Sequence, residues 1–243
     1  MKTRVTGRAP INIALIKYWG KKDPVEVIPY QPSISLSLDI FETVTTIERT
    51  QLPFQLSING KKDEVTQKKV INFLKHFTNN ETLFGIRVET NNSGPTAAGL
   101  ASSASGFAAL AVTANAFVET KYSLEALSVI TRKGSGSAIR SLLPDCVIWK
   151  SDGLIEQVDW PYKDVKMGIV IISDKKKDVG STEGMARSVD TSPQYKDWVK
   201  QSFIDAERFK QLIDLNDFDA LGLLIEENAL YMHEICETSN PPI

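Results

Sequence analysis

The sequence predicts an α+β fold, in which a part rich in strands comes first and two successive helices follow. Apolar and polar residues alternate through Ile34, Leu36, Leu38 and Ile40, and the β-branched run 43–47 continues this strand pattern. Near the end of the chain, apolar residues recur at helical spacing over 193–213 and again over 218–235. Strands and helices that are segregated along the chain are typical of α+β proteins.

The composition excludes several classes of protein. The chain has 243 residues, of which 42% are hydrophobic and 24% are charged, so it can bury a core of its own. A net charge of -2 gives no basic excess, and we expect no nucleic-acid partner. Signal-peptide and membrane-spanning patterns are absent, which favours a cytoplasmic protein without membrane contact. Cys146 and Cys236 are expected to be reduced thiols.

Further elements of the first part follow in order. Residues 13–16 read as a buried strand, and the spacing of Val70, Phe73, Leu74 and Phe77 predicts a helix that ends at 79–80. A short strand over 86–89 leads into a loop at 91–95. An alanine-rich helix follows over 101–118, and Ser123 is the expected N-cap of a helix over 124–132.

The second part begins with a polar stretch. The apolar run 165–172 predicts a buried strand, and residues 174–187, with two glycines, suggest a domain junction. We therefore predict domains at 1–180 and 181–243. Ser192 and Pro193 look like an N-cap and a first helical residue. Residues 239–243 read as a loop, so we expect the fold to continue beyond Ile243 and the second domain to be incomplete.

Residues 95–105 carry the strongest chemical motif. Small residues precede a long helix, whose N-terminal N–H groups and dipole favour a phosphate. The pattern is neither a Walker A loop nor a dinucleotide fingerprint. A tightly packed helix start without a ligand fits the composition equally well. The candidate nucleotide-binding residues are Ala97, Ala98, Gly99, Leu100, Ala101, Ser102, Ser103 and Ser105.

Two more clusters can bind anions. The first, 17–21, reads Lys-Tyr-Trp-Gly-Lys and follows a buried strand, so a plain surface turn is its simplest interpretation. The second, 134–141, reads Gly-Ser-Gly-Ser-Ala-Ile-Arg-Ser, in which glycine and serine allow a tight anion-binding turn. Arg140 adds a planar fork that matches a carboxylate or phosphate. A flexible Gly/Ser connector is the alternative.

The loop at 95–105 resembles the ATP phosphate loop of the GHMP kinase superfamily. The stretch 12–21 and the cluster 134–141 are similar, more specifically, to the mevalonate diphosphate decarboxylase family. Gly184-Met185 and the run 189–192 give a fourth match, and the resemblance extends from about residue 8 to residue 242. It implies a GHMP-kinase-like two-domain fold with the active site in the interdomain cleft. Homodimers are common in this family.

The resemblance also implies an activity. ATP phosphorylates the 3-hydroxyl of mevalonate 5-diphosphate, phosphate and CO₂ then leave, and isopentenyl diphosphate forms for isoprenoid synthesis. Catalysis in such a lyase is largely positioning and electrostatics. ATP and Mg²⁺ are the expected cofactors, with Ser103 as the metal contact and Lys177 near the ATP phosphates.

The remaining roles implied by the resemblance concern the substrate. Lys17 is expected near the reacting centre, and Arg140 at the substrate carboxylate. A pocket with two lysines and two serines favours a diphosphate over a monophosphate. The residues expected to bind the substrate are Tyr18, Trp19, Lys21, Ser135, Gly136, Ser137, Arg140 and Ser192.

Two departures from the family pattern leave alternatives open. The chain has no Asp-x-Gly-Pro-Asn motif, whose aspartate is expected to orient or deprotonate the 3-hydroxyl. Residues 142–146 stand where the family usually has an aromatic residue and a Gly-Gly or Gly-Pro pair, which leaves the geometry behind Arg140 open. A GHMP small-molecule kinase that releases no CO₂, or a non-catalytic binding protein, are the two other interpretations.

Overall fold

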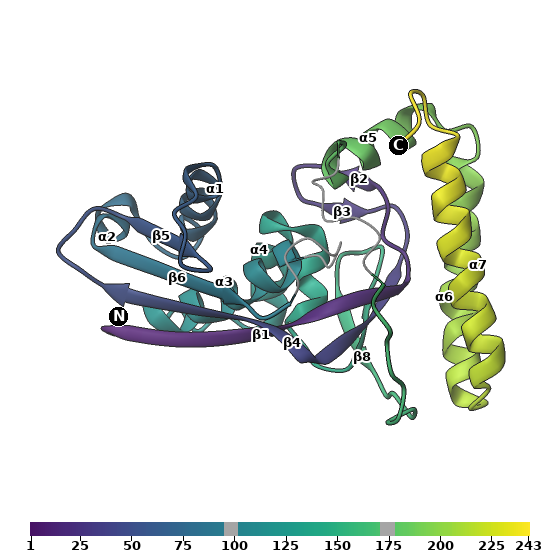
Figure 1. The fold of residues 1–243 in the computed structure, drawn as a ribbon, viewed down its shortest axis with the longest axis horizontal. Helices are drawn as coiled ribbons and strands as arrows, with labels where there is room; N and C mark the ends of the chain where they lie inside the picture. The colour runs from purple at the N-terminus through teal and green to yellow at the C-terminus, as the bar shows by residue number, and fades with distance from the viewer. Residues whose placement is uncertain (95–101, 171–177) are drawn as a thin grey trace. The chain divides into compact units, whose positions relative to one another are not determined.

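The computed structural model describes residues 1–94, 102–170 and 178–243 (Figure 1). Within these residues the chain forms the following elements: β1 (Arg4–Ile16), β2 (Lys21–Asp23), β3 (Ile28–Pro29), β4 (Ser33–Arg49), β5 (Gln55–Ile58), α1 (Glu64–Leu74), α2 (Asn80–Phe84), β6 (Ile86–Asn92), α3 (Ser102–Val118), α4 (Leu124–Gly134), the 3₁₀ helix η1 (Gly136–Ser141), β7 (Cys146–Trp149), β8 (Ile155–Val158), α5 (Ser181–Thr191), α6 (Tyr195–Asp214) and α7 (Phe218–Glu237).

The chain divides into two compact units. Unit 1 comprises Met1–Asn12 and Ser37–Pro144, and unit 2 comprises Ile13–Leu36 and Asp145–Ile243. Strands β1 and β4 each contribute residues to both units, so the division does not follow a single cut in the sequence. The boundary near residue 180 stays a prediction.

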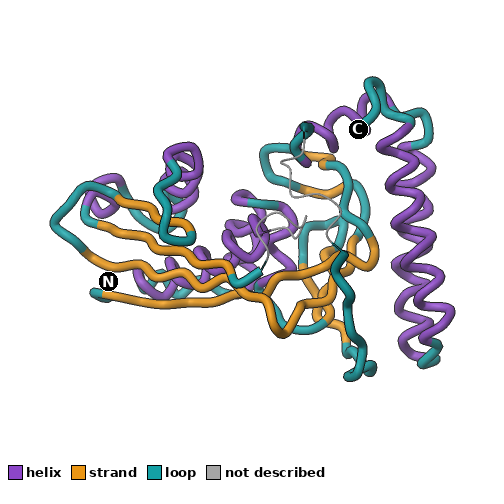
Figure 2. The backbone as a smooth tube through the Cα atoms, viewed as in Figure 1, coloured by secondary structure: helices purple, strands orange, loops and turns teal. Residues whose placement is uncertain are grey.

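Unit 1 is built on strands that pair with the second half of β4. Strand β6 runs antiparallel to β4, with Thr45 opposite Thr90, and β5 pairs with β6 in parallel. The hydroxyls of Thr45 and Thr90 lie 2.6 Å apart and share a hydrogen bond. Ile47, Val88 and Phe117 are almost completely buried in the core that these strands share with α3. Figure 2 shows the strands of this unit in orange.

In unit 1 the start of α4 is as predicted, but the helix expected to end at 79–80 already ends at Leu74. Asn79 begins α2 instead, because its side chain accepts a hydrogen bond from the Thr82 N–H at 3.0 Å. Ser123 accepts a hydrogen bond from the Ala126 backbone N–H at 3.2 Å, which confirms it as the N-cap of α4. Fully buried alanines let α3 pack closely, and α3 lies against both α4 and η1. A Cβ atom on Gly134 would overlap the ring of Phe107, so a larger residue there would have to displace that ring.

Unit 2 joins a short sheet to a pair of helices. The first four residues of β4 run antiparallel to β7, and β7 runs antiparallel to β8. Helices α6 and α7, each of 20 residues, lie side by side (Figure 1). Their buried faces, including Phe209, Leu221 and Leu224, form one core with Ile34 and Ile148. The two helices predicted at the end of the chain are therefore confirmed.

In the rest of the chain, other details differ from the sequence-based expectations. Residues 165–170 form no strand, and Val170 is 84% exposed; 171 and 172 lie outside the described residues. An apolar run becomes a strand only where a neighbour pairs with its backbone, and no described strand does so here. Ser192 is not the N-cap of α6: it ends α5, its N–H donating to the Ser188 carbonyl at 3.0 Å, and α6 starts at Tyr195. Finally, the polar stretch 174–187 includes the start of α5, a helix that the sequence did not predict.

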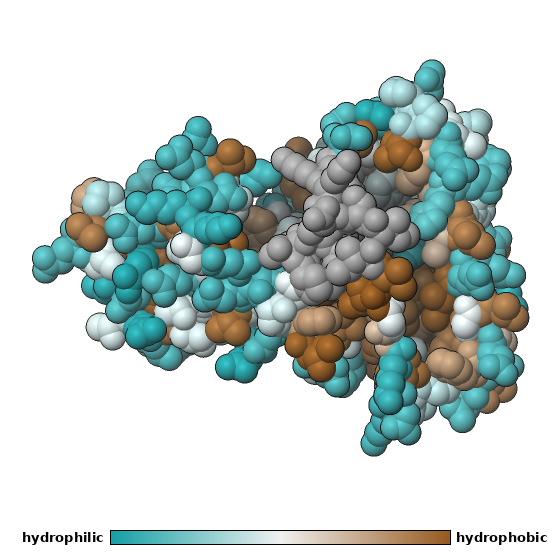
Figure 3. All heavy atoms as spheres, in the orientation of Figure 1, coloured by the Kyte–Doolittle hydropathy of each residue, from teal (hydrophilic) through white to brown (hydrophobic). Residues whose placement is uncertain are grey.

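The surface is ordinary for a globular chain. Hydrophilic side chains cover most of the visible face around α1 and α2 in unit 1 (Figure 3). In unit 2, the helix pair leaves some large apolar side chains partly exposed, among them Ile204 and Leu223. None of the helices in the described ranges is both long enough and apolar enough to cross a bilayer.

Candidate active site

The segment 17–21 follows β1, and its backbone is held by side chains of α6 and α7. The Lys17 N–H donates to Asn228 Oδ1 at 2.8 Å, and the Tyr195 hydroxyl donates to the Trp19 carbonyl at 2.8 Å. Gly20 has φ +119°, and a Cβ atom there would overlap the Tyr195 hydroxyl. Only glycine fits this position, since it tolerates both the positive φ and the close approach.

The two aromatic side chains of this segment, Tyr18 and Trp19, pack against different neighbours. The Trp19 indole N–H donates to Ser188 Oγ at 2.9 Å, and its ring lies over Gly184, where a Cβ atom would come within 3.2 Å. The Tyr18 ring packs against Trp149 with a centroid distance of 4.7 Å. The match at Gly184 therefore has a physical basis, because a larger residue would press on Trp19.

The charged side chains of the segment are only partly hydrated. Lys17 Nζ donates to the Ala14 carbonyl at 2.9 Å. Burial lowers the pKa of the Lys21 ammonium below its ordinary value. An anion beside Lys21 would be bound strongly, because the ammonium has already lost part of its water.

Ser192 lies at the turn between α5 and α6. It is 8% exposed, and its hydroxyl shares a 2.9 Å hydrogen bond with the Thr238 hydroxyl, which in turn donates to the Glu234 carbonyl. A ligand that needs the Ser192 hydroxyl as a donor would have to compete with Thr238.

The Gly/Ser cluster forms η1 in unit 1. Asn12 Nδ2 donates to Ser141 Oγ at 2.7 Å and to the Ser137 carbonyl at 3.4 Å, which ties the turn to β1. The hydroxyls of Ser135 and Ser137 lie 3.3 Å apart, and Gly136 between them is buried. Arg140 is only 2% exposed, which is rare for a cation and costly without partners.

Residues 142–146 form a well-defined turn behind Arg140. The Leu142 N–H closes η1 on the Ile139 carbonyl, and Asp145 takes a φ of +59° before β7 begins. A left-handed aspartate can replace a glycine, since Asp and Asn tolerate this region better than other residues. Burial, and then the neighbouring Asp145, raise the pKa of the Cys146 thiol to about 12. The departure at 142–146 is therefore compatible with an ordered η1.

The predicted phosphate loop falls largely outside the described residues. Ala97, Ala98, Gly99, Leu100 and Ala101 are not described, and neither are Lys177 and the side chain of Ser102. The helix that follows is present, and Ser103 is exposed in its first turn. Ser105 is fully buried, and its hydroxyl shares a 2.7 Å hydrogen bond with Thr43.

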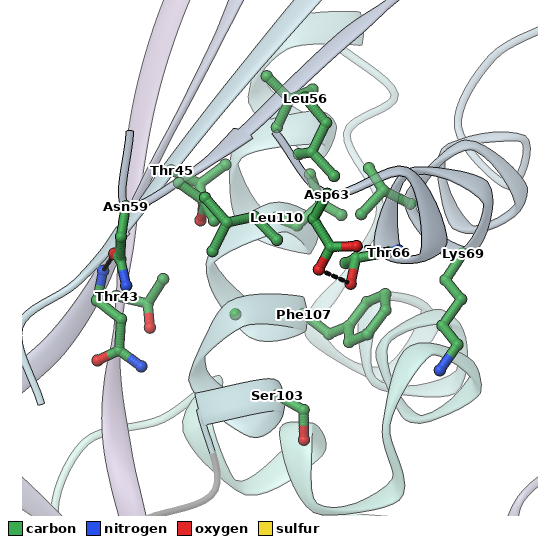
Figure 4. Close-up of a pocket in the computed structure, with 16 residues that line it drawn as sticks. Thr43, Thr45, Leu56, Asn59, Asp63, Thr66, Lys69, Ser103, Phe107 and Leu110 are labelled. Atoms are coloured by element: carbon green, nitrogen blue, oxygen red, sulfur yellow. Dashed lines mark hydrogen bonds between the residues drawn. The ribbon is translucent and has the colours of Figure 1, made fainter. Parts of the chain in front are cut away.

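A pocket of about 330 Å³ lies beside the start of α3, entirely within unit 1 (Figure 4). Strands β4, β5 and β6 supply one wall, and α1 and α3 supply the others. Polar groups come from Thr45, Asn59 and Lys69, while Phe107 and Leu110 give it an apolar floor. Its size and mixed lining suit a planar, hydrogen-bonding ligand group.

The structure thus gathers the candidate residues locally within each unit. Unit 2 contains Lys17, Tyr18, Trp19, Lys21 and Ser192, with the backbone of Lys17 and Trp19 held by α7 and α6. Unit 1 contains η1, Ser103 and the pocket. Sequence reasoning missed the pocket, because its lining residues are spread over 43–110 and only Ser103 belongs to the motif 95–105. It also missed Asn228 and Asp205, although each is a polar residue on an otherwise apolar helix face.

Comparison with known proteins shows the family of the chain. The family model for the diphosphomevalonate decarboxylase-like N-terminal domain matches residues 9–157, and the model for the mevalonate 5-diphosphate decarboxylase C-terminal domain matches residues 167–243. The chain belongs to the diphosphomevalonate decarboxylase family. The family resemblance drawn from the three motifs is therefore confirmed.

Relatives in this family show how much of the fold is present. The diphosphomevalonate decarboxylase of Ganoderma lucidum is 34% identical over 99% of this chain, which spans 67% of that relative. Mevalonate pyrophosphate decarboxylase from Streptococcus pyogenes is 35% identical, with a TM-score of 0.89 over 99% of this chain and 77% of its own. A second structure, MDDEF in complex with MVAPP, AMPPCP and magnesium, is 36% identical, with a TM-score of 0.86 and the same coverage.

Proposed function

We propose that this chain catalyses the ATP-dependent decarboxylation of mevalonate 5-diphosphate, giving isopentenyl diphosphate, ADP, phosphate and CO₂. The proposal rests on the match of both family domains to nearly the whole chain. The segment 17–21 and η1 are also each held in an ordered structure with groups that can bind an anion. A related structure that holds MVAPP and AMPPCP supports a diphosphate substrate and ATP.

The substrate diphosphate is assigned to donors from both motifs. Lys21 and Tyr18 provide an ammonium and a hydroxyl, and Ser135, Gly136 and Ser137 provide hydroxyls and backbone N–H groups. Such donors hold a diphosphate through charge-assisted hydrogen bonds. Trp19 and Ser192 complete this set, Trp19 by fixing the segment 17–21 and Ser192 through its hydroxyl.

Arg140 and Lys17 are assigned to the reacting end of the substrate. The guanidinium of Arg140 binds the carboxylate bidentately and orients it for the loss of CO₂. Phosphorylation turns the tertiary hydroxyl into a leaving group, and its departure builds positive charge that the carboxylate electrons quench. Lys17 stabilises the phosphoryl oxygens while this bond breaks.

ATP is assigned to unit 1. Phosphates placed at residues 97–105, at the start of α3, leave the nucleoside next to the pocket of about 330 Å³. Mg²⁺ usually takes one or two protein ligands and keeps phosphate oxygens and waters for the rest. The exposed Ser103 hydroxyl fits this role, and within the described residues no cluster of three His, Cys, Asp or Glu side chains offers a competing site. The bound ion would neutralise the phosphate charge during transfer.

Location and assembly are parts of the same proposal. Cys146 and Cys236 are buried and form no disulfide, which supports work in the reducing cytoplasm. A homodimer is expected from the family resemblance, and light scattering coupled to gel filtration tests it. The net charge of -2 supports the absence of a nucleic-acid partner.

The test of function supplies the chain with MgATP and mevalonate 5-diphosphate and measures ADP and CO₂ together. Equal release of both supports the decarboxylase. ADP without CO₂ would instead identify a kinase that acts on a mevalonate derivative, the alternative left open by the absence of an Asp-x-Gly-Pro-Asn motif in residues 1–243. Binding of both ligands without turnover would identify a non-catalytic binding protein.

A further inference from the structure

The backbone of Lys17 has a buried partner that no sequence motif includes. Lys17 is the first residue after β1, and its N–H donates to Asn228 Oδ1 at 2.8 Å across 211 residues of sequence. Asn228 is 2% exposed and lies on the face of α7 that also buries Leu221 and Leu224. A buried amide on an apolar helix face is costly unless its donors and acceptor are satisfied.

A carboxylate on α6 fixes the direction of this amide. Asn228 Nδ2 donates to Asp205 Oδ2 at 2.7 Å, and Gln201 Nε2 donates to Asp205 Oδ1 at 2.8 Å. An ionised carboxylate only accepts hydrogen bonds, so the amide nitrogen of Asn228 must face Asp205. The amide oxygen is then left facing the Lys17 N–H, and the opposite orientation would bring two N–H donors together.

We infer that Asn228 and Asp205 are positioning residues for Lys17, which they hold by its backbone rather than by its side chain. This inference rests on the proposed function, in which Lys17 works at the reacting centre. Strand β1 ends at Ile16, so without Asn228 the Lys17 backbone loses the hydrogen bond that ties it to α7. A displacement of about 1 Å at such a residue costs on the order of a hundredfold in rate.

The test exchanges the two side chains. Asn228→Asp alone places two carboxylates in contact and abolishes the fixed orientation. The double variant Asn228→Asp with Asp205→Asn restores it, because the amide introduced on α6 then donates to the carboxylate introduced on α7, which still accepts from the Lys17 N–H. Asp205→Asn alone completes the double-mutant cycle.

Three quantities are measured for each variant: kcat, the KM for ATP, and hydrogen exchange of the Lys17 amide by NMR. We expect Asn228→Asp to lower kcat at least about tenfold and to speed Lys17 exchange at least about tenfold, with little change in the KM for ATP. The double variant should recover both kcat and protection.

A control separates positioning from general stability. Leu221→Ala opens a cavity on the same helix face, about 10 Å along α7 from Asn228, and should lower the melting temperature without changing Lys17 exchange or kcat.

Four results would overturn the inference. They are normal CO₂ release by Asn228→Asp, an unrecovered kcat in the double variant, unchanged Lys17 exchange throughout, or a loss of kcat in Leu221→Ala equal to that in Asn228→Asp. Failure of the wild-type chain to release CO₂ would refute the proposed function itself. This outcome can be told apart from the four above because it occurs without any substitution.

Discussion

The Tyr195 hydroxyl donates to the Trp19 carbonyl at 2.8 Å and fills the space where a side chain on Gly20 would lie. One buried phenol on α6 therefore fixes both the conformation and the residue type of the segment 17–21. Burial raises the pKa of this phenol well above its ordinary value, which favours the protonated form that donates to Trp19.

Substitution of Gly20 should separate steric conflict from backbone strain. Gly20→Ala forces a Cβ atom into the Tyr195 hydroxyl at positive φ, and we expect it to lower the free energy of unfolding by roughly 3 kcal/mol or more. Gly60→Ala is the matched control, since Gly60 also has a positive φ, of +75°, but nothing lies near its Cβ position. Its cost should be about 1 kcal/mol. Urea unfolding measures both, and equal losses would show that Tyr195 is not the obstacle.

The pocket beside α3 predicts a selective loss of nucleotide affinity. Gly106 lines this pocket with open space at its Cβ position, so Gly106→Leu should fill part of the pocket and weaken ATP binding at least about tenfold. Gly222→Leu in α7, also with open space, is the control for helix propensity, and both variants should gain up to about 1 kcal/mol of stability.

Calorimetry with two ligands checks this assignment. Tripolyphosphate lacks a nucleoside, so its affinity should not change in Gly106→Leu. If both ligands weaken to the same extent, the pocket is not the nucleoside site.

Arg140 should not tolerate replacement by lysine. Arg140→Lys keeps the charge but loses the bidentate fork, and we expect kcat/KM for mevalonate 5-diphosphate to fall about a hundredfold. Arg132→Lys is the matched control, because Arg132 is also buried, at 6% exposed, but lies in α4 outside the assigned site. Steady-state kinetics of CO₂ release distinguishes them, and a similar fall in both variants would point to lost packing instead.

Cys146 predicts a loss of stability at alkaline pH. Its folded pKa is raised from 9.0 to about 12 by burial and by Asp145, so between these values the unfolded thiol ionises and the folded one does not. The folded state then binds more protons, and the free energy of unfolding falls by up to about 1.4 kcal/mol per pH unit above about pH 9. In Cys146→Ser this contribution disappears, so the stability gap between the two proteins should narrow from about pH 8 to about pH 10. A gap that stays constant would contradict the raised pKa.

Sequence reasoning found the elements whose signal is local. The N-cap Ser123, the alternating strand at Ile34–Ile40 and the terminal helices are confirmed, since capping and periodicity act over a few residues. Helix α5 was missed because Ser181–Thr191 is largely polar. Its N-cap, Gly180, also has no side chain that could make the capping hydrogen bond by which a helix start is recognised. Residues 165–170 were predicted as a strand wrongly, because pairing depends on a neighbour that an apolar run cannot reveal.

The candidate site shows the same limit. The clusters 17–21 and 134–141 are contiguous, so their residue types were visible at once. Their supports are not: Asn228, Tyr195 and Ser188 lie far along the chain from the residues they bind, by 211, 176 and 169 positions, and their hydrogen bonds follow from tertiary packing. Asn228 did give a sequence signal of its role as a support, because it is a polar residue on the buried stripe of α7, four residues after Leu224.

The anchors of the segment 17–21 act mainly on main-chain atoms, the N–H of Lys17 and the carbonyl of Trp19. The shape of the segment is therefore largely independent of the side chains at positions 17 and 21. Evolution, or a saturation library at these two positions, can change which anion is bound and how it reacts without rebuilding the loop that presents it.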